Sequence, residues 1–239
     1  MTDLTLTIAA QVAEYWRRER ELENVSPLSA AQRRAQEATT AERARLKADG
    51  VPADVIKPGT TVSDATLIDP FGADTTLYRA IPAGQAAVIV FYRGAWCPFC
   101  NIALRTYQDV LLPELQSRGV ALLAVSPQKP DGSLTMKQKH DLTFSVLSDP
   151  GLKLAEQIGV VMYLSDSTRQ AIIDAGLNFA ATNVDGSPAL PMPTVLILDA
   201  DRVVRWIKVN PDWTDRSEPA EIVQALDALQ IAAQGSRSR

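Results

Sequence analysis

The spacing of apolar residues predicts helices and strands in alternation along most of the chain. Two amphipathic helices are predicted near the N-terminus, over residues 4–22 and 30–47. From Gly59 onward the pattern changes to short apolar runs separated by turn signals. The predicted strands are 60–68, 75–77, 86–93, 120–125, 144–148, 194–198 and 203–209, and the later helices start at 97 and cover 133–141, 152–158, 169–175 and 218–232. This alternation, ending in a hairpin, indicates an α/β sandwich around a mixed sheet.

The same pattern predicts three parts of the chain. Residues 1–57 form an N-terminal helical extension, residues 58–233 form the α/β domain, and residues 234–239 form a flexible tail. The extension is expected to pack on the domain or on a second subunit, with a partner-binding arm as the alternative. Pro113 lies inside the helix that starts at residue 97, and it is expected to kink or interrupt that helix.

Composition narrows the classes of function. The 239 residues are 46% hydrophobic and 22% charged, which is typical of an ordinary globular protein. A net charge of −4 and a pI near 5.1 argue against nucleic-acid binding, which usually needs a basic patch. No apolar run approaches the ~20 residues of a membrane helix, and the first residues do not resemble a secretory signal. We therefore expect a cytoplasmic protein that contacts neither nucleic acid nor membrane.

The candidate chemistry lies in a Cys-x-x-Cys motif that follows a buried strand. Cys97 and Cys100 are the only cysteines of the chain, and the helix predicted to start there presents unpaired N–H groups and a partial positive charge. A thiolate at this position is stabilised, so Cys97 is expected to have a lowered pKa and to be the more exposed nucleophile. A purely structural disulfide between such near neighbours would constrain the unfolded chain very little, which favours a redox role.

Three segments carry a resemblance to a known family. They are Phe91-Tyr-Arg-Gly-Ala-Trp-Cys-Pro-Phe-Cys100, Leu147-Ser-Asp-Pro-Gly-Leu-Lys-Leu-Ala155, and Pro191-Met-Pro-Thr194. From Gly59 to about Leu229 the chain resembles the peroxiredoxin-like branch of the thioredoxin fold, the alkyl hydroperoxide reductase/thiol-specific antioxidant group. The resemblance implies a thioredoxin-like sandwich, with a central mixed sheet flanked by helices, and a thiol-based antioxidant activity.

The active-site loop departs from the peroxiredoxin pattern. Gly94 and Val90 stand where peroxiredoxins have a Thr and a Pro, and Pro193 stands where they have an Arg. Pro193 instead matches the proline that faces the dithiol in thioredoxins, so Pro193 and Met192 are expected to face the two cysteines. The buried acid of thioredoxins is also missing from the strand before Cys97. The resemblance thus implies a peroxiredoxin-like body with a loop similar to that of thioredoxin or glutaredoxin.

The predicted function is a thiol oxidoreductase that cycles Cys97 and Cys100 between dithiol and disulfide. Cys97 attacks a peroxide oxygen or a disulfide sulfur, and Cys100 resolves the product. An external thiol reductant, such as a thioredoxin or glutaredoxin system, then restores the dithiol, and no cofactor is required. Without the family's Thr and Arg, we expect modest peroxidase activity that depends on backbone N–H groups and on an Arg that the sequence does not identify.

Two other residues of the loop, Trp96 and Arg93, have two interpretations each. Trp96 either shields the sulfur atoms or is plain core. Arg93 either adds positive potential or is a solvated residue at a strand end. Pro98 loses little by lacking an N–H at the first helical position. Farther along, residues 212–216 are expected to cap the last helix, with Trp213 packed on the sheet edge.

Two other classes of function stay open. A metal or iron–sulfur module would use the two cysteines, and His140 is the only histidine that could join them, which falls short of the usual four ligands. A non-catalytic redox sensor or scaffold would use the N-terminal helices to hold a partner. The resemblance also implies a homodimer, which the helical extension would suit.

Overall fold

The computed structural model describes residues 7–130 and 141–230. The helix predicted over 133–141, the single His140 and the tail predicted over 234–239 therefore lie outside the described residues, apart from Asp141.

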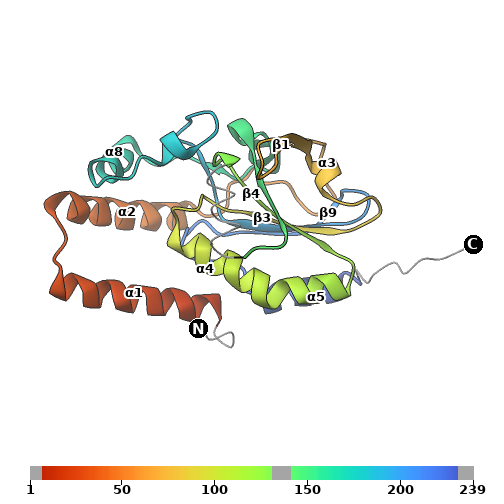
Figure 1. Cartoon of the computed structure of the whole chain (residues 1–239), viewed down its shortest axis with the longest axis horizontal. Coiled ribbons are helices and arrows are strands. Elements are labelled where there is room, and N and C mark those ends of the chain that lie inside the picture. Colours follow the sequence, from red (N-terminus) through yellow and green to blue (C-terminus); the bar gives the residue numbers. More distant parts are fainter. Residues whose placement is uncertain (1–6, 131–140, 231–239) are drawn as a thin grey trace, which may run out of the picture.

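The N-terminal extension consists of two long helices whose starts are capped by side chains. Helix α1, Ile8–Val25, begins after Thr7, whose hydroxyl accepts a hydrogen bond from the Ala10 N–H. Helix α2, Ala30–Asp49, begins with a capping box between Ser29 and Gln32. Both predicted helices are confirmed, and in Figure 1 they extend side by side away from the sheet.

A seven-stranded mixed sheet forms the centre of the molecule. Its order is β2-β1-β5-β4-β3-β8-β9. The strands are β1 Thr66–Ile68, β2 Asp74–Thr76, β3 Ala87–Phe91, β4 Ala121–Ser126, β5 Ser145–Ser148, β8 Thr194–Leu198 and β9 Val204–Val209. Strands β3, β4 and β5 are parallel, whereas β8 runs antiparallel to both β3 and β9. Every residue of β3 is buried, as its unbroken apolar run predicts.

One predicted strand is shorter than expected. Of residues 60–68 only Thr66–Ile68 join a named strand, while Thr61 forms an isolated bridge with Val203. The segment therefore follows the edge of the sheet near Val203 before it pairs with β2 and β5.

Helices cover both faces of this sheet. Figure 1 shows α4 Pro98–Thr106 and α5 Leu112–Ser117 on one side, and α3 Leu77–Ala80 and α8 Asp166–Asp174 on the other. The remaining elements are the π-helical turn η1 Tyr107–Leu111, the 3-10 turns η2 Pro150–Leu152 and η3 Phe179–Thr182, the helices α7 Lys153–Ile158 and α9 Pro219–Ala228, and the paired short strands β6 Val161–Met162 and β7 Leu190–Pro191. The predicted α/β sandwich is confirmed.

The helix after the two cysteines is interrupted, as Pro113 predicts. Helix α4 ends at Thr106, and a π-helical turn separates it from α5, where Pro113 lies in the first turn and its missing N–H costs nothing. Tyr107 begins this turn, and its buried hydroxyl donates to the Ser217 carbonyl at 2.7 Å. The irregularity thus brings α4 against the segment that precedes α9.

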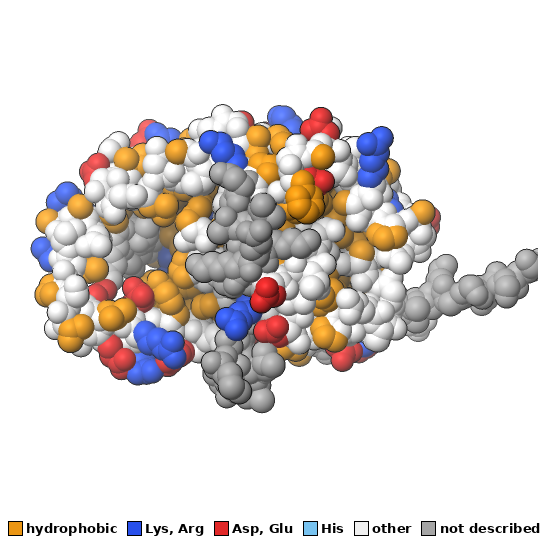
Figure 2. Space-filling view, viewed as in Figure 1, with side chains coloured by type: hydrophobic (Ala, Val, Ile, Leu, Met, Phe, Trp, Pro, Cys, Tyr) orange, Lys and Arg blue, Asp and Glu red, His pale blue; other side chains and the backbone are white. Residues whose placement is uncertain are grey.

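Each helix of the extension contacts a different part of the α/β domain. On α1, Tyr15 and Trp16 meet Phe99 of α4, with ring centroids 5.4 and 5.3 Å from it. On α2, the buried Glu42 accepts hydrogen bonds from the N–H and hydroxyl groups of Ser165 at the start of α8. In Figure 2 apolar side chains are visible between the two helices. No helix among residues 7–130 and 141–230 is long and apolar enough to span a bilayer.

Candidate active site

The strand β3, a tight loop and the start of α4 place the two cysteines. Cys97 is the residue that precedes the first turn of α4, and Pro98 follows in that turn, where a missing N–H is tolerated. The Cys97 N–H donates to the Gly94 carbonyl, and the Cys100 N–H donates to the Cys97 carbonyl, both at 3.1 Å. Cys100 therefore lies one helical turn after Cys97 on the same helix, as the spacing predicts.

The loop needs glycine at position 94. The φ angle of Gly94 is 150°, which L side chains rarely adopt. A Cβ atom at this position would also lie 2.5 Å from Nε1 of Trp96 and 2.9 Å from Oε1 of Gln128. That same Gln128 oxygen accepts a hydrogen bond from the Ala95 N–H at 2.6 Å. The close approach explains why the Thr of the peroxiredoxin pattern is absent here.

Both cysteines are reduced and buried. Cys97 is 1% exposed, and Cys100 is fully buried. An exposed Cys97 at the helix start is therefore not found, because both cysteines are buried in the core and differ by only 1% against 0% exposure. A substrate therefore reaches the sulfur atoms only after a local opening.

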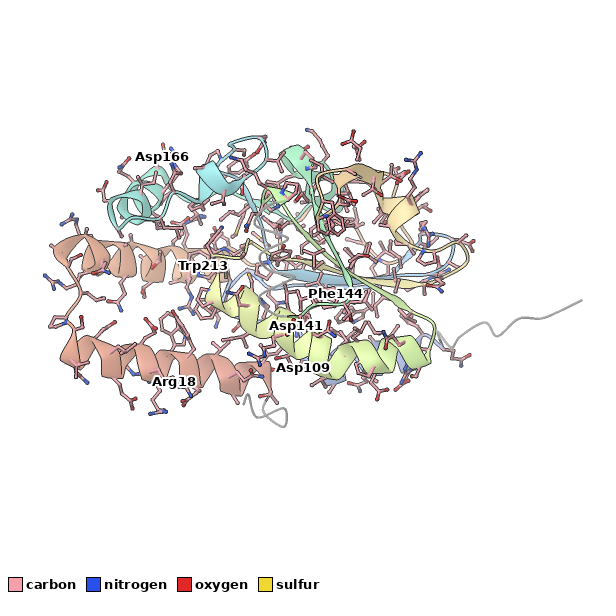
Figure 3. The ribbon with its side chains drawn as sticks, viewed as in Figure 1. Arg18, Asp109, Asp141, Phe144, Asp166 and Trp213 are labelled. Atoms are coloured by element: carbon pink, nitrogen blue, oxygen red, sulfur yellow. The ribbon has the colours of Figure 1, made fainter. Side chains whose placement is uncertain are left out.

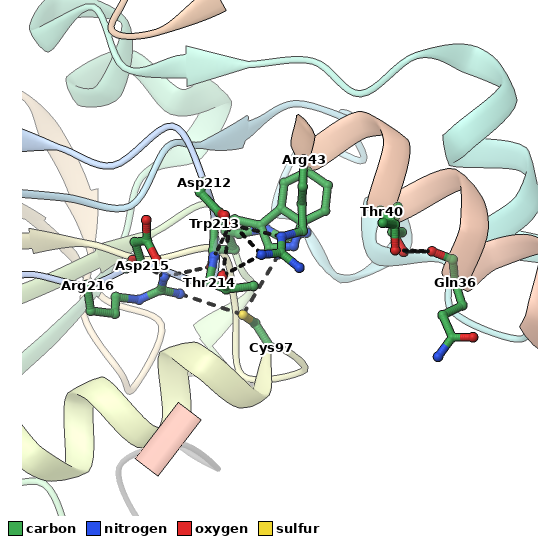
Figure 4. Close-up of polar contacts among 11 residues, drawn as sticks. Gln36, Thr40, Arg43, Cys97, Asp212, Trp213, Thr214, Asp215 and Arg216 are labelled. Carbon is green, nitrogen blue, oxygen red and sulfur yellow. Dashed lines mark hydrogen bonds and ion pairs between the residues drawn. The ribbon is translucent and has the colours of Figure 1, made fainter. Parts of the chain in front are cut away.

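Two guanidinium groups approach the sulfur atoms. Nη2 of Arg216 is 3.1 Å from Sγ of Cys100 and 3.9 Å from Sγ of Cys97. Nη1 of Arg93 is 4.0 Å from Sγ of Cys97. Arg93 is only 5% exposed, so the interpretation of a solvated strand-end residue is wrong. That its charge acts on the thiols stays a prediction, which its distance from Cys97 favours. Figure 4 shows Arg216 directed toward Cys97.

Aromatic side chains enclose Arg93. Its guanidinium carbon lies 4.7 Å from the ring centroid of Trp96 and 4.7 Å from that of Trp213. Such cation–π contacts partly replace the water that a buried guanidinium loses. Trp96 also stacks on Phe179 and packs against the core, and its shielding of the sulfur atoms stays a prediction. Trp213 lies near the start of α4 in Figure 3. It thus lies against a side chain of the site, whereas the sequence favoured packing on the sheet edge and gave a functional role only as the weaker alternative.

The pKa values of the two cysteines are shifted in opposite directions. Burial, together with the hydrogen bond to Cys100, raises the pKa of Cys97 well above its ordinary value. Burial also opposes ionisation of Cys100, but the hydrogen bond from Cys97 and the charges of Arg216 and Arg93 outweigh it and lower its pKa. The lowered pKa expected for Cys97 is therefore not found in the reduced protein, because burial and the hydrogen bond with Cys100 outweigh the charges of Arg93 and Arg216.

The segment that carries Arg216 is tied to helix α2. Nε and Nη2 of Arg43 each donate to a carboxylate oxygen of Asp212 at 2.9 Å, and Nη2 also donates to the hydroxyl of Thr214 (Figure 4). Arg216 itself donates from Nη1 to the carbonyl of Trp213. Sequence reasoning missed Arg216 because it lies 116 residues from Cys100, within a segment that resembles an ordinary helix cap.

The predicted partners Met192 and Pro193 approach the same edge of the sheet. Thr194 pairs with Phe91 in the β3–β8 register, so the two preceding residues reach the end of β3 from which the active-site loop departs. Among residues 7–130 and 141–230 all peptide bonds are trans, so Pro193 differs from the cis-proline of thioredoxins. That these two residues face the dithiol stays a prediction.

A metal centre needs several ligating side chains close together. Within 7–130 and 141–230, no group of three or more His, Cys, Asp or Glu side chains is arranged to hold a metal ion. The atoms that approach the two sulfurs are guanidinium nitrogens, which repel cations. This arrangement can stabilise a thiolate or an oxyanion.

Comparison with known proteins agrees with this fold. The model of the AhpC/TSA family matches residues 58–207. The chain is 34% identical to peroxiredoxin Bcp of Escherichia coli over 77 residues, which cover 32% of this chain and 49% of that protein. It is 31% identical to a putative peroxiredoxin of Mycobacterium tuberculosis over 97 residues, covering 40% and 59% of the two chains. The chain thus spans about half the length of the curated relatives it matches.

A solved structure extends the likeness to the whole α/β domain. The chain resembles reduced Prx3 of Vibrio vulnificus in complex with H2O2, with a TM-score of 0.58 and 21% identity over 72% of this chain and 99% of that one. At this identity the likeness concerns the fold, and it confirms the predicted thioredoxin-like sandwich. Arg216, Trp213 and both N-terminal helices lie outside the residues that the family model matches. The chain belongs to the AhpC/TSA family.

Proposed function

We propose that this protein is a dithiol peroxidase that reduces peroxides through Cys97 and Cys100. The observation that carries the proposal is the pair of guanidinium groups beside the Cys-x-x-Cys sulfurs, one from the buried Arg93 and one from the partly buried Arg216. Positive charge fixed in a site of low dielectric stabilises the negative charge that develops when an O–O bond breaks. Arg216 would supply what the Thr and Arg of the peroxiredoxin pattern supply elsewhere.

In the first step Cys97 attacks the peroxide. Its proton passes along the hydrogen bond to the Cys100 thiolate, and Sγ of Cys97 then forms a bond to the outer peroxide oxygen. The O–O bond breaks, and the leaving alkoxide or hydroxide takes a proton to become alcohol or water. Cys97 is thereby oxidised to a sulfenic acid, and the peroxide is reduced.

In the second step Cys100 resolves the sulfenic acid. Sγ of Cys100 attacks Sγ of Cys97, the S–O bond breaks, and the hydroxyl leaves as water with the Cys100 proton. The resulting disulfide is reduced by an external dithiol, such as a thioredoxin or glutaredoxin system, which becomes a disulfide itself. A cycle of this kind suits the reducing cytoplasm. A homodimer and the division into 1–57, 58–233 and 234–239 stay predictions.

The burial of both sulfurs favours peroxide over a protein disulfide as the oxidant. A hydroperoxide contains few atoms, so a small local opening admits it, whereas a mixed disulfide with a protein needs a thiol on the surface. Disulfide reduction therefore ranks second, and a redox sensor without turnover ranks third.

Stopped-flow oxidation of the reduced protein, followed by tryptophan fluorescence, tests the proposal. Hydrogen peroxide and an organic hydroperoxide should each oxidise the wild type, with one disulfide formed per peroxide consumed. Cys97→Ser should abolish the reaction, and Cys100→Ser should retain the oxidation but stop at the sulfenic acid. The proposal fails if Cys97→Ser reacts as fast as the wild type, or if a disulfide substrate oxidises the protein much faster than either peroxide.

A further inference from the structure

The active site holds more positive charge than negative charge. Arg93 and Arg216 each approach a cysteine sulfur, and the reduced pair provides one thiolate. Within 7–130 and 141–230, neither guanidinium forms an ion pair with an Asp or Glu, although thirteen such pairs occur elsewhere. Two cations therefore face one anion even before the site is oxidised.

One of these cations also has an unused hydrogen-bond donor. Nε of Arg93 is buried and has no partner among the described residues, and the same is true of Nε1 of Trp96, whose ring lies against that guanidinium. The Arg93 side chain is 95% buried, so bulk water does not satisfy this N–H group. Buried donors without an acceptor are rare and call for a ligand.

Oxidation makes the imbalance larger. Formation of the Cys97–Cys100 disulfide removes the thiolate, which is the only negative charge that contacts Arg93 and Arg216 in the part of the chain described here. Two guanidinium groups then remain without a counter-charge inside the protein, which is costly in a desolvated site.

We propose that the disulfide form binds a small monoanion, of the carboxylate type, at Nε of Arg93 beside Cys97, and that reduction of the disulfide releases this anion. The inference rests on the proposed dithiol–disulfide cycle. A carboxylate matches the guanidinium geometry and accepts from Nε. The balanced step joins the anion-bound disulfide and an external dithiol, and it yields that dithiol's disulfide, one protein thiol, one thiolate, one proton and the free anion.

An anion that binds only the oxidised protein must lower the reduction potential of the protein. Above the dissociation constant of the anion, each tenfold increase in its concentration should lower the equilibrium constant for reduction tenfold, which is ~30 mV for a two-electron couple. Anions should also slow peroxidase turnover, because they stabilise the disulfide that the external dithiol has to reduce.

The experiment measures the reduction potential of the full chain in dithiol redox buffers against sodium formate. Sodium gluconate, a larger anion, keeps the ionic strength constant. The expected result is a fall of ~30 mV per tenfold increase in formate for the wild type. Arg93→Met, which keeps an apolar stem between the two indoles, should abolish this dependence. Arg20→Met, at an exposed position of α1, changes the net charge equally and should retain it.

Each outcome is decisive. If the reduction potential of the wild type does not change with formate concentration, the inference is overturned, even if Arg93→Met does not fold. An unchanged formate dependence in Arg93→Met overturns it as well, since the anion then binds elsewhere. Thiol counting runs in parallel. A protein that forms no Cys97–Cys100 disulfide contradicts the proposed function and the inference together, whereas a normal disulfide with a formate-independent potential contradicts the inference alone.

Discussion

At the scale of single residues, the chemistry of this site depends on Arg216 more than on the position of Cys97 at a helix start. A helix N-terminus contributes roughly half an elementary charge, and its influence fades within one turn. A full guanidinium charge 3.1 Å from the Cys100 sulfur in a buried site has a larger effect. Together with the hydrogen bond from Cys97, which is the larger cause, this charge lowers the pKa of Cys100 in spite of its burial.

Arg216→Met should therefore impair peroxide reduction strongly. Loss of one fixed charge at a developing oxyanion typically lowers a rate ~10²–10³-fold. The same substitution should raise the pKa of the dithiol, so thiolate absorbance should appear only at higher pH. The measurements are the second-order rate of oxidation by peroxide and a thiolate titration in the ultraviolet.

Arg105→Met is the matched control, because Arg105 lies on α4 but is half exposed and pairs with Asp109. It should leave both measurements close to the wild type. An Arg216→Met protein that folds, keeps the wild-type titration and reacts at the wild-type rate would show that Arg216 has no part in the chemistry.

At the scale of elements, helix α1 acts as a cover for the active-site helix. Its Trp16 and Tyr15 form edge and tilted contacts with Phe99, which lies between the two cysteines in sequence. The first N–H groups of α1 donate to the Glu218 carboxylate at 2.9 and 2.8 Å, which fixes the N-terminal end of the helix beside α9. Access to the sulfurs then depends on local opening of α1.

Trp16→Ala should accelerate modification of the reduced cysteines by a small alkylating reagent. An aromatic pair contributes ~0.5–1.5 kcal/mol, so loss of the Trp16–Phe99 pair between α1 and α4 should favour the open state by about 2- to 12-fold. Trp206→Ala removes a half-buried indole from β9 and serves as the control. Equal alkylation rates in wild type and Trp16→Ala would show that α1 does not limit access.

At the scale of the whole molecule, one ion pair joins the N-terminal extension to the active site. Asp212 receives two hydrogen bonds from Arg43 of α2, and Arg216 follows four residues later on the same loop. Although its partial burial opposes ionisation, Arg43 and Thr214 hold the pKa of Asp212 at about 2. Because this value is below the ~3.9 of an unfolded chain, the pair stabilises the fold above pH ~4 and its contribution disappears as the pH falls through 2.

Asp212→Asn should therefore lower the free energy of unfolding by about 2 kcal/mol at neutral pH. The difference from wild type should shrink as the pH falls from 4 toward 2, where the wild-type carboxyl is protonated as well. Urea denaturation at several pH values measures both quantities. Asp201→Asn, in an exposed turn, is the control, and a deficit in Asp212→Asn that does not change with pH would contradict the role of the charge.

The sequence by itself determined the local features of this protein. Periodicity and capping residues located α1, α2 and the strands of the sheet, and Pro113 marked the interruption after α4, because these features depend on neighbours a few residues away. The sequence also placed Cys97 and Cys100 one turn apart at the start of a helix. The resemblance of three short motifs was enough to indicate the family.

Only the tertiary structure decided what surrounds the sulfurs. Arg93 appeared to be a strand-end residue in solvent, and it is buried because Trp213, from a distant segment, closes over it. Arg216 reaches Cys100 because Tyr107 and Arg43 hold its loop from two different helices. Such contacts join positions more than a hundred residues apart, and no local pattern encodes them, since they arise when independently formed elements pack together.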